Sequence, residues 1–111
     1  MSTNKIKSYG KSVIKTEISG AKKLFKSINS DFARAINKLS KIKGKVIMTG
    51  VGKSGHIASK ISSTMSSTGT LSQYCSPTDM SHGDLGIITK NDAIIIISNS
   101  GKSEEFRALL D

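Results

Sequence analysis

The sequence has few of the residues that mark secreted, membrane-bound or disulfide-rich proteins. Its 111 residues include one proline, no tryptophan and a single cysteine, Cys75. One cysteine cannot form an internal disulfide, which fits a reducing cytoplasm, and without basic neighbours Cys75 is predicted to be a small buried residue. The longest apolar run, Ala93 to Ile97, is much shorter than the roughly 18 residues of a membrane span. We therefore predict a cytoplasmic protein of one domain at most, with neither a membrane segment nor a secretory signal.

Acidic residues are scarce in the first part of the chain. Residues 1–43 hold eleven Lys or Arg and two acids, whereas residues 44–111 hold six of each, so the net charge of +9 comes from the first segment. Such a segment is typical of nucleic-acid binding. Its lysines are nevertheless spread around a predicted helix, without interleaved aromatic residues for base stacking. We expect a solvated helical surface, and nucleic-acid binding is kept only as an alternative.

Apolar residues at intervals of three and four predict helices in residues 1–43. The first stripe comprises Ile6, Tyr9, Val13, Ile14, Ile18, Ala21, Leu24, Phe25 and Ile28. Residues 29–31, Asn-Ser-Asp, are typical of a capped helix restart, and a second helix is expected from Phe32 to a stop at Gly44. The stripe either covers a sheet or makes subunit contacts, and we expect a homo-oligomer.

From residue 44 onward, short apolar segments alternate with helical ones. Strands are predicted over residues 45–49, 71–75 and 93–98, and helices over residues 54–68 and 103–110. Four consecutive isoleucines in the third strand are typical of parallel sheets covered by helices on both faces. The pattern predicts an α/β fold, a three-layer sandwich with a parallel sheet. Residues 1–43 would form an N-terminal helical segment and residues 44–111 the sheet-containing part.

A glycine-rich loop, GVGKSG, follows the first predicted strand and opens a helix at residues 50–55. It is not a Walker A loop, because the required first glycine would fall at Ile47. It matches the dinucleotide fingerprint, but no acidic residue follows about 20 positions later to bind a ribose, so we expect no NAD. Free amides at a helix start favour an anion, and Lys53 adds a positive charge there. A tight turn with a surface lysine remains the alternative.

A serine-rich loop, SNSGKS, follows the third predicted strand at residues 98–103. Hydroxyls and helix-start amides together form a phosphate cradle without a metal ion, although simple helix capping would also need a serine. Ligands of open α/β sheets bind at the carboxyl ends of the strands, where both loops would lie. We therefore predict a phosphorylated ligand. Glu104 and Glu105 either stabilise the helix dipole or act as a general acid or base.

Four segments in this order resemble the sugar isomerase (SIS) domain family, and within it the arabinose-5-phosphate isomerases. These segments are GVGKSGHIASKIS from Gly50, SSTGT from Ser66, SHGDLG from Ser81 and SNSGKSEE from Ser98. The resemblance implies a flavodoxin-like five-stranded parallel sheet, commonly followed by two CBS domains. It also implies the interconversion of arabinose 5-phosphate and ribulose 5-phosphate through an enediol.

The resemblance and the two loops together give a set of candidate site residues. Lys53 and Glu105 match positions that the family needs for activity, where Lys53 would polarise a substrate oxygen and Glu105 would shuttle protons. Substrate binding is expected for Gly52, Ser54, Gly69, Thr70, His82, Ser98, Ser100, Gly101 and Ser103. We expect no cofactor.

The sequence departs from the family pattern at three places. Ser76 stands before Pro77 where the family usually has His, so no metal site is expected, and Lys102 stands where an acid is common. The sequence also stops at Asp111, before later catalytic segments, two strands and both CBS domains. We therefore expect a truncated domain of about three strands with little activity alone. The alternative is a non-enzymatic module that senses a phosphosugar or regulates a partner.

Overall fold

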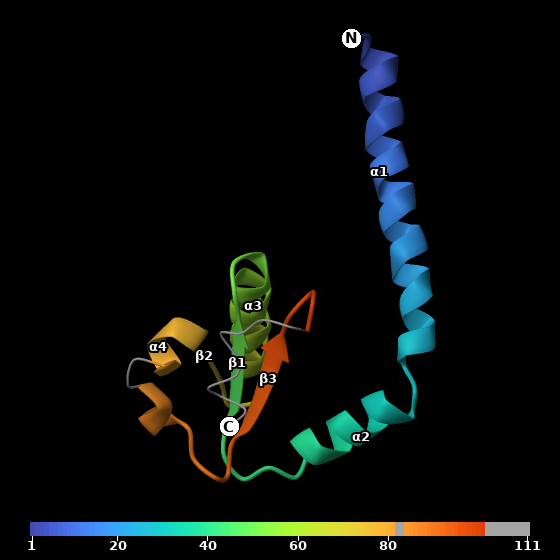
Figure 1. Cartoon of the computed structure of the whole chain (residues 1–111). Coiled ribbons are helices and arrows are strands. Elements are labelled where there is room, and N and C mark those ends of the chain that lie inside the picture. Colours follow the sequence, from blue (N-terminus) through green and yellow to red (C-terminus); the bar gives the residue numbers. More distant parts are fainter. Residues whose placement is uncertain (82–83, 102–111) are drawn as a thin grey trace. The chain divides into compact units, whose positions relative to one another are not determined.

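The chain forms two compact units in the computed structural model, which describes residues 1–81 and 84–101 (Figure 1). One unit comprises Met1–Lys38, and the other begins at Leu39. The first unit is helical, whereas the second contains the sheet and the helices that cover it.

The first unit consists of α1 (Thr3–Lys23), η1 (Leu24–Ser27) and most of α2 (Ser30–Leu39). The Lys5 amide donates to the Ser2 side chain over 3.2 Å and starts α1. The Phe32 amide donates to the Asn29 side chain over 3.1 Å, which confirms the predicted capped restart. Every residue of this unit is exposed. No helix in residues 1–81 and 84–101 is long and apolar enough to cross a membrane.

The second helix ends earlier than its apolar spacing predicted. It stops at Leu39 rather than continuing to Gly44. The Gly44 amide donates instead to the Asn91 carbonyl over 2.9 Å, which directs the chain into the sheet. Ile42 lies outside the helix but still packs against the core, so burial rather than helical periodicity explains this apolar residue.

Within residues 1–81 and 84–101 the sheet has three parallel strands in the order β2-β1-β3. They are β1 (Val46–Gly50), β2 (Ser72–Tyr74) and β3 (Ala93–Ile97). The central strand β1 is buried at all five positions, as its apolar composition requires in a sheet covered on both faces. The predicted α/β fold with a parallel sheet is confirmed.

The two faces of β1 carry two apolar clusters. On one face α3 (Lys53–Ser67) packs against the sheet, and its cluster comprises Val46, Met48 and Ala58. The other face packs toward α4 (Pro77–Ser81) and the end of η2 (Asp84–Ile87), and its cluster comprises Ile47, Cys75 and Met80. Cys75 is buried, as predicted. The sequence patterns did not predict α4 and η2.

Candidate functional site

Two loops leave the sheet side by side at the carboxyl ends of β1 and β3. Gly50 and Ile97, the last residues of these strands, are paired in the parallel register. A cavity of about 500 Å³ lies where the loops begin. It is lined by Lys53, Ser54, Ile57, Ile97, Ser98 and Asn99. The glycine-rich and serine-rich loops therefore meet at one cavity, as expected for the carboxyl edge of a parallel sheet.

The glycine-rich loop presents the start of α3 to this cavity. Gly52 precedes the helix with φ +60° and ψ −127°, a conformation that favours glycine, and within residues 1–81 and 84–101 the helix has no side-chain cap at this N-cap position. The first backbone bond of the helix runs from the His56 amide to the Gly52 carbonyl over 3.2 Å. The amides of the first helical turn therefore lack intrahelical partners, and the helix dipole is positive at this end. Both effects favour an anion beside Lys53 and Ser54.

The turn between β1 and α3 is packed too closely for side chains on two of its glycines. A Cβ atom on Gly50 would lie 2.8 Å from the Ser54 backbone. A Cβ atom on Gly55 would lie 2.7 Å from the Gly50 carbonyl oxygen and 2.9 Å from the Tyr74 hydroxyl. That hydroxyl donates to the Gly50 carbonyl over 3.3 Å. Glycine at these positions lets the helix start lie directly against the end of β1.

The serine-rich loop closes on itself through one described hydrogen bond. The Gly101 amide donates to the Ser98 hydroxyl over 3.0 Å, and Gly101 adopts φ +66°. Ser98 is half-buried, whereas Asn99 and Ser100 are exposed. Because the Ser98 oxygen accepts this bond, its own proton can be donated toward the cavity.

The other predicted site residues lie elsewhere or outside the described residues. Gly69, with φ +100°, and Thr70 follow the C-terminus of α3, where the Thr70 amide donates to the Met65 carbonyl over 2.8 Å. A helix of 15 residues separates them from the cavity by about 20 Å. The structure therefore does not bring them to this cavity. The predicted roles of His82, Ser103 and Glu105 concern positions outside residues 1–81 and 84–101.

Ser76 has a structural partner at the place where the resemblance had suggested a histidine. Its hydroxyl accepts from the Asp79 amide over 3.1 Å, while Pro77 forms the first residue of α4. This is an ordinary helix N-cap followed by proline. Among the residues that the structure describes, no three His, Cys, Asp or Glu side chains lie together as metal ligands would.

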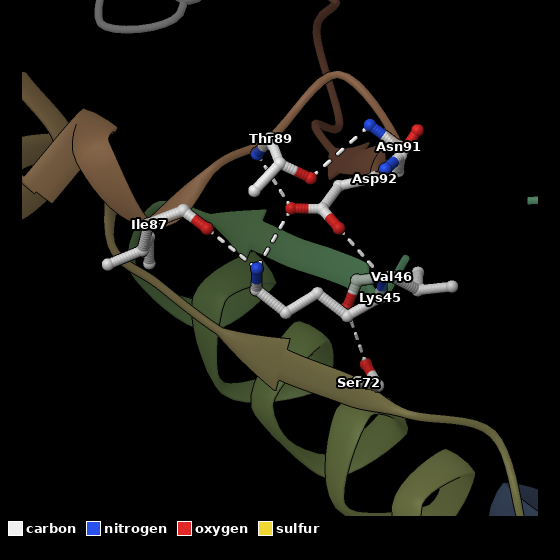
Figure 2. A network of polar contacts seen from close by, with 7 residues as sticks. All are labelled: Lys45, Val46, Ser72, Ile87, Thr89, Asn91 and Asp92. Atoms are coloured by element: carbon white, nitrogen blue, oxygen red, sulfur yellow. Dashed lines mark hydrogen bonds and ion pairs between the residues drawn. The ribbon is translucent and has the colours of Figure 1, made fainter. Parts of the chain in front are cut away.

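A partly buried ion pair joins the opposite, amino-terminal ends of β1 and β3 (Figure 2). The Lys45 ammonium donates to the Asp92 carboxylate over 2.8 Å and to the Ile87 carbonyl over 2.6 Å. The amides of Lys45 and Thr89 each donate to the same carboxylate over 2.8 Å. The Asp92 side chain is only 2% exposed. The Lys45 side-chain hydrogen bond, followed by these two amides, holds the pKa of Asp92 well below its usual range.

Four residues near the cavity were not predicted from the sequence. Asn99, Ile57 and Ile97 line the cavity. Asn99 had a sequence signal, because it lies inside the predicted serine-rich loop. The two isoleucines were assigned to a helix and a strand, and their spacing did not show that their side chains would reach a cavity. Tyr74 lies 24 residues from the carbonyl that it contacts, so no local pattern could have found it.

Comparison with known proteins gives three findings. The family model of the SIS domain matches residues 38–111. An arabinose 5-phosphate isomerase, KdsD, of Yersinia pestis is 46% identical to this chain, and the match covers 91% of this chain and 31% of KdsD. An uncharacterised protein of Rickettsia prowazekii is 44% identical, and the match covers 100% of this chain and 35% of that protein. The solved structure of c3406 from E. coli CFT073, in complex with arabinose 5-phosphate, matches with a TM-score of 0.91 and 40% identity over 99% of this chain and 58% of that chain. The chain thus spans about a third of the length of these curated relatives.

Proposed function

This chain belongs to the SIS domain family, and from that membership we propose that its carboxyl-end cavity binds the phosphate of a sugar phosphate. The observation that carries the proposal is the pairing of Gly50 with Ile97, because it brings two loops with anion-binding chemistry to one cavity. Each loop alone is also compatible with a simple turn. Their meeting at the carboxyl edge of a parallel sheet favours a ligand that both can contact.

The groups around the cavity suit a phosphate attached to a small carbon chain. Lys53 contributes a charge, and the uncapped start of α3 contributes amide donors and a positive dipole end. The Ser98 hydroxyl contributes a donor from the other loop. Ile57 and Ile97 form apolar walls beside these polar groups. A cavity with apolar walls and a few convergent polar groups is the usual form of a small-molecule site.

We further propose the aldose–ketose isomerisation of arabinose 5-phosphate to ribulose 5-phosphate as the activity. Support comes from the KdsD relative and from the structural similarity to a protein in complex with arabinose 5-phosphate. In this reaction C2 of the aldose loses a proton while O1 gains one, which gives an enediol. The C2 hydroxyl then loses its proton to become the ketone carbonyl, while C1 gains a proton. Lys53 would polarise the substrate oxygen, and Glu105 would move the proton. That the 111 residues alone have little activity is part of this proposal.

A binding titration with a matched pair of lysine variants tests the phosphate site. We expect Lys53→Met to weaken arabinose 5-phosphate binding by about tenfold, since a hydrogen bond to a charged group contributes roughly that factor. Lys60→Met removes a charge from the same helix without altering the residues that line the cavity, so its affinity should equal that of the unchanged chain. Equal affinities for both variants would refute the phosphate site.

The isomerase proposal needs a separate measurement of ribulose 5-phosphate formation by the 111-residue chain. Binding with slow turnover that Lys53→Met abolishes would support it. Binding with no turnover above the buffer would instead favour the non-enzymatic sensing module. Turnover equal to that of a full-length KdsD would contradict the expectation of little activity.

We also propose that the chain is a homo-oligomer. The helical unit Met1–Lys38 has no buried residue, although side chains such as Ile6, Val13 and Ile18 are large and apolar. An apolar stripe of this kind is typical of a contact surface. Sedimentation equilibrium should therefore give a mass of at least two chains, and Val13→Glu should lower it. A monomeric mass for the unchanged chain would refute the homo-oligomer.

A further inference from the structure

Tyr74 is attached to the core at one end and to the glycine-rich turn at the other. It is the last residue of β2 and is paired with Met48 of β1. Its ring packs against the apolar cluster beneath α3. Its hydroxyl extends beyond that cluster and donates to the Gly50 carbonyl over 3.3 Å. The core therefore fixes the ring, and the ring fixes where the hydroxyl lies.

The hydroxyl lies between the two ends of the turn that leads into α3. Gly50 is the last residue of β1, and Gly55 is in the first turn of the helix. A Cβ atom on Gly55 would be 2.9 Å from the hydroxyl and 2.7 Å from the Gly50 carbonyl oxygen. The phenol oxygen thus occupies space that a side chain on residue 55 would fill, and it can lie there only because residue 55 is glycine. It contacts the strand end through a hydrogen bond and the helix start through close packing.

We propose that Tyr74 is a positioning residue for the anion-binding start of α3, an inference that rests on the proposed phosphate site. Its hydroxyl holds the Gly50 carbonyl and packs on Gly55, which sets where the amides of the first helical turn face. Those amides belong to the residues that line the cavity, Lys53 and Ser54. The cavity lining does not include Tyr74 itself, so its effect on the ligand passes through the turn.

Tyr74→Phe tests this role because it removes one oxygen and keeps the ring in the core. Titration of the 111-residue chain with inorganic phosphate and with arabinose 5-phosphate should show about threefold to tenfold weaker binding, the range of one hydrogen bond. Ser72→Ala is the matched control from the same strand. Its hydroxyl bonds the Val46 carbonyl and the Ser62 hydroxyl, both over 2.9 Å, at the other end of β2. We expect this variant to lose stability and keep its affinity.

Amide hydrogen exchange supplies a readout that does not depend on a ligand. The His56 amide, which forms the first backbone bond of α3 with Gly52, should exchange about threefold faster in Tyr74→Phe and unchanged in Ser72→Ala. Unchanged exchange or unchanged affinity in Tyr74→Phe would overturn the positioning role, and so would equal weakening of binding in both variants. If the unchanged chain binds neither phosphate nor arabinose 5-phosphate, the proposed function fails, and this role in ligand binding fails with it. If the unchanged chain binds and Tyr74→Phe binds equally well, only the positioning role fails.

Discussion

The polar groups at the two ends of the sheet differ in how fully they are paired. At the amino end, the Asp92 carboxylate accepts from two backbone amides and from the Lys45 ammonium, with its side chain almost fully buried (Figure 2). Even a Cβ atom on Gly44 would collide with that carboxylate. At the carboxyl end, α3 starts at Gly52 without a side-chain cap, beside a cavity. One end is closed by internal partners, whereas at the other end the described part of the chain provides no side-chain cap at the N-cap of α3.

The amino end of the five-residue strand β1 therefore contributes mainly to stability, and its carboxyl end contributes to the proposed ligand binding. Buried polar groups stabilise a fold only when they are paired, which the amino end achieves. Helix-start amides left without partners are a cost in the ligand-free fold that an anion can relieve. Changes at the amino end should therefore alter stability first, and changes at the carboxyl end should alter affinity as well.

The largest effect on stability is expected from Asp92→Asn. An amide cannot accept from three donors as a carboxylate does, and it leaves the Lys45 ammonium, which is 20% exposed, without its counter-charge. We expect the melting temperature to fall by roughly 10 °C, because breaking a partly buried pair leaves an uncompensated charge that is largely shielded from water. The control is Asp31→Asn, which breaks an exposed pair with Arg34 and should change the melting temperature little. Similar losses in both variants would show that the buried network has no special role.

The pH dependence of the same pair sharpens this test. The pKa of Asp92 is lower in the folded chain than in the unfolded chain, so the unfolded chain binds the proton more readily. The stabilisation of the folded chain by ionised Asp92 is therefore fully present above the unfolded pKa of about 3.9. That stabilisation is lost as the pH falls toward the lower folded-state pKa. The difference in melting temperature between the unchanged chain and Asp92→Asn should be constant near neutral pH and shrink below about pH 4. A difference that grows on acidification would contradict this.

A smaller loss is expected at the carboxyl end from Gly55→Ala. The new methyl group would press on the Gly50 carbonyl and the Tyr74 hydroxyl, so the free energy of unfolding should fall by about 1–3 kcal/mol. Phosphate affinity should fall as well, which urea unfolding and titration would show. Gly20→Ala is the control, since nothing lies within 4 Å of its added methyl group, and it should raise helix stability by roughly 1 kcal/mol. Equal behaviour of the two variants would refute the close packing of the turn.

The smallest effect is expected from Thr49→Val, just before the glycine-rich loop. The Thr49 hydroxyl is buried and has no hydrogen-bond partner among residues 1–81 and 84–101. Replacing it with a methyl group should leave the free energy of unfolding unchanged or raise it by about 1 kcal/mol, because an unpaired hydroxyl is desolvated at a cost. Ser62→Ala, which removes one of the two hydrogen-bond partners of the Ser72 hydroxyl, should instead destabilise by about 1 kcal/mol. Destabilisation by Thr49→Val would reveal a partner for that hydroxyl.

The sequence was sufficient to predict the elements that have their own periodicity or composition. The apolar run of β1, the isoleucines of β3 and the helical stripe of α3 all lie within a residue or so of their predicted ranges. The two loops could be located because each directly follows a strand, and parallel order then placed them at one edge. The site roles of Lys53, Ser98 and the others stay predictions, as does the cytoplasmic location.

The remaining features depend on contacts that no local pattern encodes. A helix of five residues, such as α4, is too short to show a period, although Ser76 and Pro77 are a cap and a typical first residue. The predicted second helix was too long because Ile42 matches the helical spacing of apolar residues. The structure shows that Ile42 instead packs against the core from outside the helix. The Lys45–Asp92 pair spans 47 residues of sequence, and Tyr74 and Gly50 are 24 apart, so only the folded chain brings them together.

The central position of β1 also governs when the sheet can be completed during protein synthesis. Because β1 is the first of the three described strands to be translated, both of its neighbours come later. Asp92, which pairs with Lys45, follows it by 47 residues. At about 5–20 residues per second, the ribosome needs several seconds to supply that carboxylate. Until β2 has been made, the most buried strand is a nascent segment with two open edges, and the edge that pairs with β3 stays open until β3 follows. Such edges are the kind of surface that chaperones recognise. The strand that organises the folded sheet is thus the one exposed longest while it is being made.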